Sequence, residues 1–107
     1  MQDTDTKPVR VETAAELDAL IDDHERLLVE LVTEGCGVCA SMEPVLGVVA
    51  TETGVPVVVV NPRDDPVLIE RFDVRSVPTL VLFEDGEAVD RLSEGFVGAE
   101  RLIEFLS

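Results

Sequence analysis

The sequence predicts an α/β fold, a three-layer sandwich in which a central mixed β-sheet carries helices on both faces. Segments with helical apolar spacing alternate with short aliphatic runs, as expected for strands covered on both faces. Asp85-Gly86 separates two late β-rich runs, which indicates a hairpin that adds antiparallel strands. Apolar residues make up 46% of the 107 residues, enough for one packed core without disulfide staples or metals.

The first elements are a short edge strand, "VRV" at 9–11, and a helix over about 13–23. "TAAE" matches a capping box, with Thr13 as the N-cap and Glu16 at the third helical position. His24 follows the helix, where its side chain can interact with the negative end of the helix dipole.

The next two elements surround the cysteines. "RLLVELVT" at 26–33 is aliphatic apart from Glu30, and its length and branching predict a buried central strand. The segment 39–53 has apolar residues three and four positions apart, as in an amphipathic helix. Pro44 lies inside that helix and should kink it.

The second half of the chain completes the sheet. "VPVVVVN" at 55–61 predicts a second buried strand, and 64–74 a short helix with proline in its first turn. The hairpin occupies 79–92, and an amphipathic helix over 98–106 closes the order β-α-β-α-β-α-β-β-α.

Length and composition indicate one domain over 9–107, preceded by a flexible N-terminus at 1–8. Residues 1–8 lack the basic start and apolar run of a signal peptide. The longest aliphatic run, at 55–60, is far below the ~20 residues that a membrane helix needs. We therefore expect a cytoplasmic protein with no membrane partner.

The net charge of −15 comes from 23 acidic and 8 basic residues, and Lys7 is the only lysine. Such a charge repels nucleic acid and opposes compaction in dilute buffer. At molar salt the Debye length falls to about 3 Å, and this repulsion largely disappears. We expect no nucleic-acid partner, and we hypothesise an acidic protein of a halophilic organism rather than one of an ordinary dilute cytosol.

Both cysteines lie in "EGCGVC" at 34–39, where the central strand ends and a helix begins. Because a helix N-terminus stabilises an anion, we expect a reactive thiolate at Cys36. Cys39 lies roughly one helical turn later and can reach Cys36 to close a disulfide. A loop this small adds little chain-entropy stabilisation, which favours a redox dithiol over a structural staple.

Two other interpretations of this pair stay open, half of a metal site or two buried sulfurs without chemistry. A structural zinc needs four Cys or His ligands, and beyond Cys36 and Cys39 the chain has only His24. We expect no metal and no cofactor within one chain, and the metal interpretation requires a site shared between two chains.

"LLVELVTEGCGVCASMEPVL", followed by "SVPTLVLFEDGE", resembles the thioredoxin family, and the resemblance covers about residues 9–106. A C-x-x-C motif alone is a weak signal, but "VPT", Pro44, the Asp-Gly hairpin and the element order make it specific. The resemblance implies a thioredoxin-like protein-disulfide reductase. It assigns Cys36 as the nucleophile and Cys39 as the resolving cysteine, which together form a redox-active disulfide.

The resemblance also implies a cis Val77–Pro78 bond, which presents the Val77 backbone groups beside the sulfurs to an extended substrate. Gly95 fits the family's late substrate-facing glycine only if the preceding hairpin has one extra residue. The substrate-binding positions expected on this basis are Gly35, Gly37, Val38, Val77, Pro78 and Gly95.

Glu30 stands six residues before Cys36, where the thioredoxin pattern has a buried acid that exchanges protons with the resolving cysteine. Desolvation in an aliphatic strand should raise the pKa of Glu30 and suit it to carry a proton. On an exposed edge strand the carboxylate would simply be solvated.

Three departures from the family pattern bear on substrate contacts and redox poise. Gly35 replaces a tryptophan, Val38 a proline, and Val59 a buried lysine common near the acid. We expect a monomer that acts on disulfide-bearing client proteins and takes electrons from a thioredoxin-reductase-type donor. The alternatives are a dithiol oxidant or isomerase on the same fold, a redox-inactive scaffold, or an inter-chain metal-binding module.

Overall fold

A computed structural model describes residues 7–107, so residues 1–6 of the predicted flexible N-terminus lie outside the described residues. The predicted element order is confirmed, with one additional 3-10 turn, η2. The elements are β1 (Val9–Val11), α1 (Ala14–Asp23), β2 (Arg26–Leu31), α2 (Gly37–Thr53), β3 (Val57–Val60), η2 (Pro62–Asp64), α3 (Pro66–Phe72), β4 (Thr79–Glu84), β5 (Glu87–Leu92) and α4 (Ala99–Phe105).

The five strands form one mixed sheet in the order β1-β3-β2-β4-β5, which confirms the predicted fold class. β1, β3 and β2 run parallel, and β4 and β5 add antiparallel neighbours beyond β2. Asp85 and Gly86 form the hairpin turn with φ of 53° and 87°, the left-handed values that a type I′ turn requires. β2 is therefore central, with a strand on either side.

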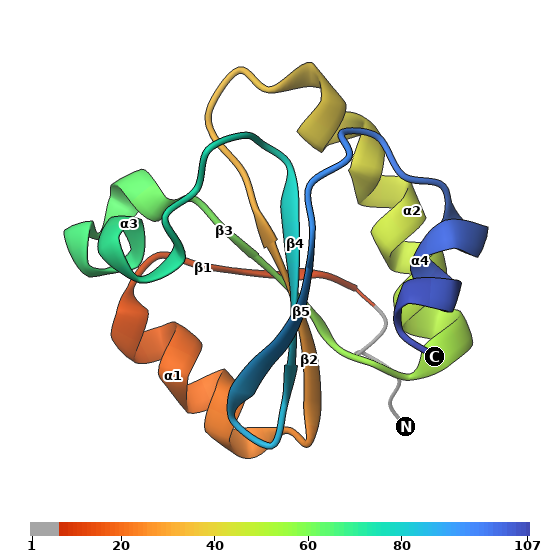
Figure 1. The fold of residues 1–107 in the computed structure, drawn as a ribbon, viewed down its shortest axis with the longest axis horizontal. Helices are drawn as coiled ribbons and strands as arrows, with labels where there is room; N and C mark the ends of the chain where they lie inside the picture. Colours follow the sequence, from red (N-terminus) through yellow and green to blue (C-terminus); the bar gives the residue numbers. More distant parts are fainter. Residues whose placement is uncertain (1–6) are drawn as a thin grey trace.

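Helices cover both faces of the sheet, with α1 and α3 on one side and α2 and α4 on the other (Figure 1). Successive residues of β2 point to opposite faces. Leu27 packs in the cluster that includes α1 and α3, and Leu28 in the cluster that includes α2 and α4. Glu30 follows the alternation of Leu28, so its side chain points into the layer between the sheet and α2.

Side chains cap α1 at both ends. The Thr13 hydroxyl accepts a hydrogen bond from the Glu16 N–H at 3.1 Å, as expected for an N-cap. In a capping box, the Glu16 carboxylate would accept a hydrogen bond from the N–H of the N-cap residue, Thr13. It accepts one from the Glu12 N–H instead, at 2.9 Å, so this second hydrogen bond of the predicted capping box is wrong. His24 Nδ1 donates to the Leu20 carbonyl at 2.9 Å, which confirms its place at the helix C-terminus.

Several element boundaries differ from those predicted, since β2 ends at Leu31 rather than 33 and α3 spans Pro66–Phe72 rather than 64–74. β3 begins at Val57 rather than 55, because Pro56 has no N–H for a strand ladder. α2 begins at Gly37, two residues before the first apolar position of its helical pattern, and continues through Pro44. Among residues 7–107, no helix combines the length and the apolar character needed to span a membrane.

Candidate functional site

The two cysteines lie where β2 leads into α2, at one end of the sheet (Figure 1). Cys36 is the N-cap of α2, and its Sγ accepts a hydrogen bond from the Cys39 N–H at 3.1 Å. The two residues are disulfide-bonded, with their Cα atoms 5.2 Å apart. Cys39 is buried and Cys36 is half-buried, so Cys36 is the more exposed residue of the pair.

The loop and first helical turn around Cys36 expose backbone and one apolar side chain. Gly35 has a φ of 76°, a left-handed value that favours glycine over a residue with a side chain. Gly35 and Gly37 are exposed, and Val38 is 41% exposed. A polypeptide approaching Cys36 from this side meets little steric obstruction.

The expected cis bond between Val77 and Pro78 is present. Val77 packs against the same apolar cluster as Cys36, and Pro78 is buried at the start of β4. The Thr79 hydroxyl donates to the Ser76 carbonyl at 2.6 Å and closes this loop. The dithiol and the Val77–Pro78 step therefore border one region of the core.

Gly95 lies in the loop between β5 and α4 with a φ of 78°. The hairpin before it carries a bulge, because Leu82 pairs with Asp90 while the next residue of β4 pairs with Ala88. The match of Gly95 to the family's late glycine stays a prediction. Phe96, which the sequence analysis did not single out, is 55% exposed beside Gly95.

Glu30 is deeply buried, with an exposure of 1%. Within the described part of the chain, its Oε2 atom has no hydrogen-bond partner. Burial is the main cause that raises the pKa of Glu30 to about 7. The Glu43 carboxylate raises this pKa further, and the Arg10 guanidinium opposes the rise. Neither residue was identified from the sequence.

A cavity of about 460 Å³ joins Glu30 to the dithiol. Both cysteines, Glu30, Arg10 and Glu43 line it. A cavity of this size, lined in part by charged side chains, has room for water, which can connect groups that are not in direct contact. Proton exchange between Glu30 and Cys39 is therefore chemically feasible in this arrangement.

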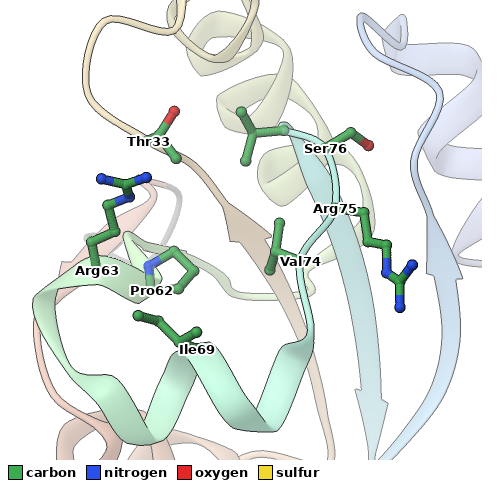
Figure 2. Close-up of a pocket in the computed structure, with 8 residues that line it drawn as sticks. Thr33, Pro62, Arg63, Ile69, Val74, Arg75 and Ser76 are labelled. Carbon is green, nitrogen blue, oxygen red and sulfur yellow. The ribbon is translucent and has the colours of Figure 1, made fainter.

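A second cavity, of about 580 Å³, lies beyond Val77 and shares Thr33 with the first. Figure 2 shows the Arg63 guanidinium on the Thr33 side of this cavity, whereas the Arg75 side chain extends away from the other lining residues. Its remaining lining residues are Pro62, Ile69, Val74 and Ser76. A cavity with apolar residues from α3 and from the segment before β4 thus lies next to the cavity that the dithiol lines.

No group of three or more His, Cys, Asp or Glu side chains within residues 7–107 is arranged to hold a metal ion. His24, the only histidine, lies at the end of α1 beside Leu20. The described residues therefore add no ligands to the two cysteines.

The Thioredoxin family model matches residues 8–107. A thioredoxin of Mycobacterium bovis is 33% identical over 101 residues, which cover 92% of this chain and 86% of that protein. Among solved structures, a mutant thioredoxin from Halobacterium salinarum NRC-1 is 30% identical with a TM-score of 0.87, over 98% of this chain and 92% of that one. A Plasmodium falciparum thioredoxin is 27% identical with a TM-score of 0.76, over 92% of this chain and 99% of that one.

Proposed function

The chain belongs to the thioredoxin family and is a thiol–disulfide oxidoreductase, and we propose that it reduces client-protein disulfides through Cys36 and Cys39. The observation that carries this proposal is the position of Cys36 at the N-terminus of a 17-residue helix. Its sulfur accepts a hydrogen bond from the Cys39 N–H, and Cys36 is more exposed than the buried Cys39. Such a site stabilises a thiolate and leaves it open to attack a client.

In the first step, the Cys36 thiolate attacks one sulfur of the client disulfide. A mixed disulfide forms between Cys36 and the client, and the other client sulfur leaves as a thiolate that takes a proton from water. No net change in the number of disulfide bonds occurs at this stage.

In the second step, the Glu30 carboxylate accepts the thiol proton of Cys39. The Cys39 thiolate attacks the Cys36 sulfur, the bond to the client breaks, and the client thiolate is protonated. The client has then gained two electrons, and Cys36 and Cys39 have become a disulfide. A Glu30 pKa of about 7 supports this role, because the group can accept and release a proton near neutral pH.

The proposed client contacts surround the dithiol. Gly35, Gly37 and Val38 lie at or just before the start of α2, and Val77 and Pro78 form the cis bond. Gly95 lies shortly after Ser93, whose hydroxyl is hydrogen-bonded to that of Thr79 beside the cis bond. Val77 also lines the 580 Å³ cavity, which supports placing an apolar client side chain there. We further propose a thioredoxin-reductase-type electron donor and a monomeric protein, and a cytoplasmic location stays a prediction.

Trapping with serine variants tests the assigned roles. Cys39→Ser should accumulate a mixed disulfide with a protein substrate, because attack proceeds while resolution cannot. Cys36→Ser should accumulate none. Turnover with dithiothreitol and a disulfide substrate should require both cysteines. Trapping by Cys36→Ser instead of Cys39→Ser would reverse the roles, and absence of turnover by the native protein would indicate a redox-inactive scaffold.

A further inference from the structure

The buried Glu30 carboxylate has no cation beside it on the neighbouring strand. The adjacent residue of β3 in the sheet register is Val59, which carries no charge. On the other side, β4 places the uncharged Leu80 opposite Glu30. Charges that act on Glu30 must therefore come from elements farther away.

Arg10 occupies such a position on the edge strand β1. It pairs in register with Val59, which in turn pairs with Glu30, so the three residues form one row across parallel strands. Residues that pair laterally in a sheet point to the same face, so the Arg10 and Glu30 side chains project on one side. Two strand spacings, roughly 10 Å, separate their backbones, and only the short Val59 side chain lies between.

Glu43 faces the same space from α2. It lies one helical turn after Cys39 and lines the 460 Å³ cavity together with Arg10 and Glu30. Arg10, Glu43 and Val59 also line an adjacent cavity of about 490 Å³, so these residues stand between the two cavities.

The other charged groups around Glu30 are few. Glu34 lines the 460 Å³ cavity, and Lys7 lines the adjacent 490 Å³ cavity. Within residues 7–107, neither Arg10 nor Glu43 forms an ion pair with another side chain. Both side chains are exposed, so water and salt weaken their fields, but no close partner among the described residues neutralises either charge.

We propose that Arg10 and Glu43 are opposed positioning residues, of which Arg10 favours and Glu43 disfavours the ionised form of Glu30. Their balance sets the pH range over which Glu30 is available to accept the Cys39 proton. The inference about Glu30 ionisation stands by itself, and its consequence for catalysis rests on the proposed function. Burial has the largest effect on the Glu30 pKa. Of the two nearby charges, Glu43 raises this pKa and Arg10 lowers it.

Neutralising each residue should move the titration of Glu30 in opposite directions. Arg10→Gln removes an attraction for the carboxylate, so the titration midpoint should rise by about 0.5–1 pH unit at low salt. Glu43→Gln removes a repulsion, so the midpoint should fall by a similar amount of about 0.5–1 pH unit. General loosening of the site would not produce opposite signs.

The experiment is a pH titration of the disulfide-bonded full chain, followed by ¹³C NMR of the glutamate carboxyl carbons. Glu30→Gln identifies the Glu30 signal by its loss. Arg10→Lys keeps the charge and should titrate like the native protein. Glu52→Gln is the matched control, because Glu52 is an exposed residue of α2 that lines neither cavity.

Opposite shifts for Arg10→Gln and Glu43→Gln, with both controls unchanged, support the proposal. Raising potassium chloride should shrink both shifts, because exposed charges are screened. Two unshifted midpoints, two shifts of the same sign, or an equal shift in Glu52→Gln would overturn it.

Stopped-flow measurement of mixed-disulfide resolution separates this proposal from the proposed function. The pH profile of resolution should move with the NMR midpoint in each variant. A shifted titration with an unmoved resolution profile would support the control of Glu30 by Arg10 and Glu43, and would overturn the role of Glu30 in resolution.

Discussion

Replacing Glu30 with leucine should stabilise the folded protein by an amount that increases with pH. The native carboxyl group is 1% exposed, and within residues 7–107 its Oε2 has no hydrogen-bond partner. Ionising such a group in the folded state is unfavourable, whereas the unfolded chain ionises it freely in water. Leucine removes this cost and fills a similar space.

The magnitude follows from the pKa of Glu30 in the two states. Folding raises this pKa from 4.5 to about 7. Because a raised folded pKa stabilises the protein below the unfolded value, that stabilisation is complete below pH 4.5 and is lost as pH rises through 7. At about 1.4 kcal/mol per pH unit, the native protein loses roughly 3 kcal/mol across this interval.

Denaturant melts of the disulfide-bonded proteins at pH 5 and pH 8, in constant potassium chloride, measure this effect. The advantage of Glu30→Leu over the native protein should be larger at pH 8 by roughly 2–3 kcal/mol. Glu30→Gln keeps the shape without the charge and should show the same pH dependence. Resolution of the mixed disulfide should slow in both variants, since neither can accept the Cys39 proton.

An advantage of equal size at both pH values would refute the reasoning, because the carboxyl group would then ionise alike in both states. A native protein that is more stable than Glu30→Leu at pH 8 would mean that the carboxylate is well paired. Unchanged resolution in a stabilised variant would make Glu30 a structural residue only.

Three further outcomes are expected. The melting temperature should rise from dilute buffer to about 1 M potassium chloride, because salt screens the repulsion that a net charge of −15 produces. A flat or falling melting temperature over this range would contradict the halophile hypothesis. Ile69→Glu should raise KM for a protein disulfide without changing turnover of a small aromatic disulfide, because Ile69 lines the 580 Å³ cavity proposed to hold a client side chain. Val67→Glu, at an equally exposed position of α3 outside that cavity, should leave both activities unchanged. Equal effects of the two substitutions would exclude a specific client contact at Ile69. Gly54→Ala should destabilise the fold by about 1 kcal/mol, because Gly54 has a left-handed φ of 74°. Gly47→Ala should stabilise it by about 0.5–1 kcal/mol, because Gly47 lies inside α2 with space for a Cβ atom. Urea melts measure both changes, and effects of the same sign would contradict this backbone argument.

Local sequence signals were sufficient for the parts of the fold that depend on neighbouring residues. The Asp85-Gly86 turn needs two left-handed residues, and few pairs supply them as readily. Glu30 could be identified because a single carboxylate interrupts an aliphatic run long enough to be a buried strand. The dithiol could be placed because that strand and the following helix both have clear apolar patterns.

Features that depend on pairing between distant segments could not be predicted in the same way. Arg10 lies in the row of Glu30 only because β1 pairs with β3 in one particular register, which three residues of strand sequence do not determine. The turn at Pro62–Asp64 was missed because 3-10 turns are short and have no apolar period. The capping box of α1 is only partly formed because the Glu16 carboxylate bonds to the Glu12 N–H, and the sequence motif does not determine which N–H it reaches.

The reduction potential of the Cys36–Cys39 pair tests the central claim, reduction of client proteins, most directly. Equilibration of the purified protein with glutathione buffers, followed by quantification of free thiols, measures it. A reductant is expected to give a value near ~−270 mV, because the disulfide form must be stable enough for electrons to pass from the dithiol to clients. A value near ~−120 mV would contradict the account and identify the chain as a dithiol oxidant on the same fold.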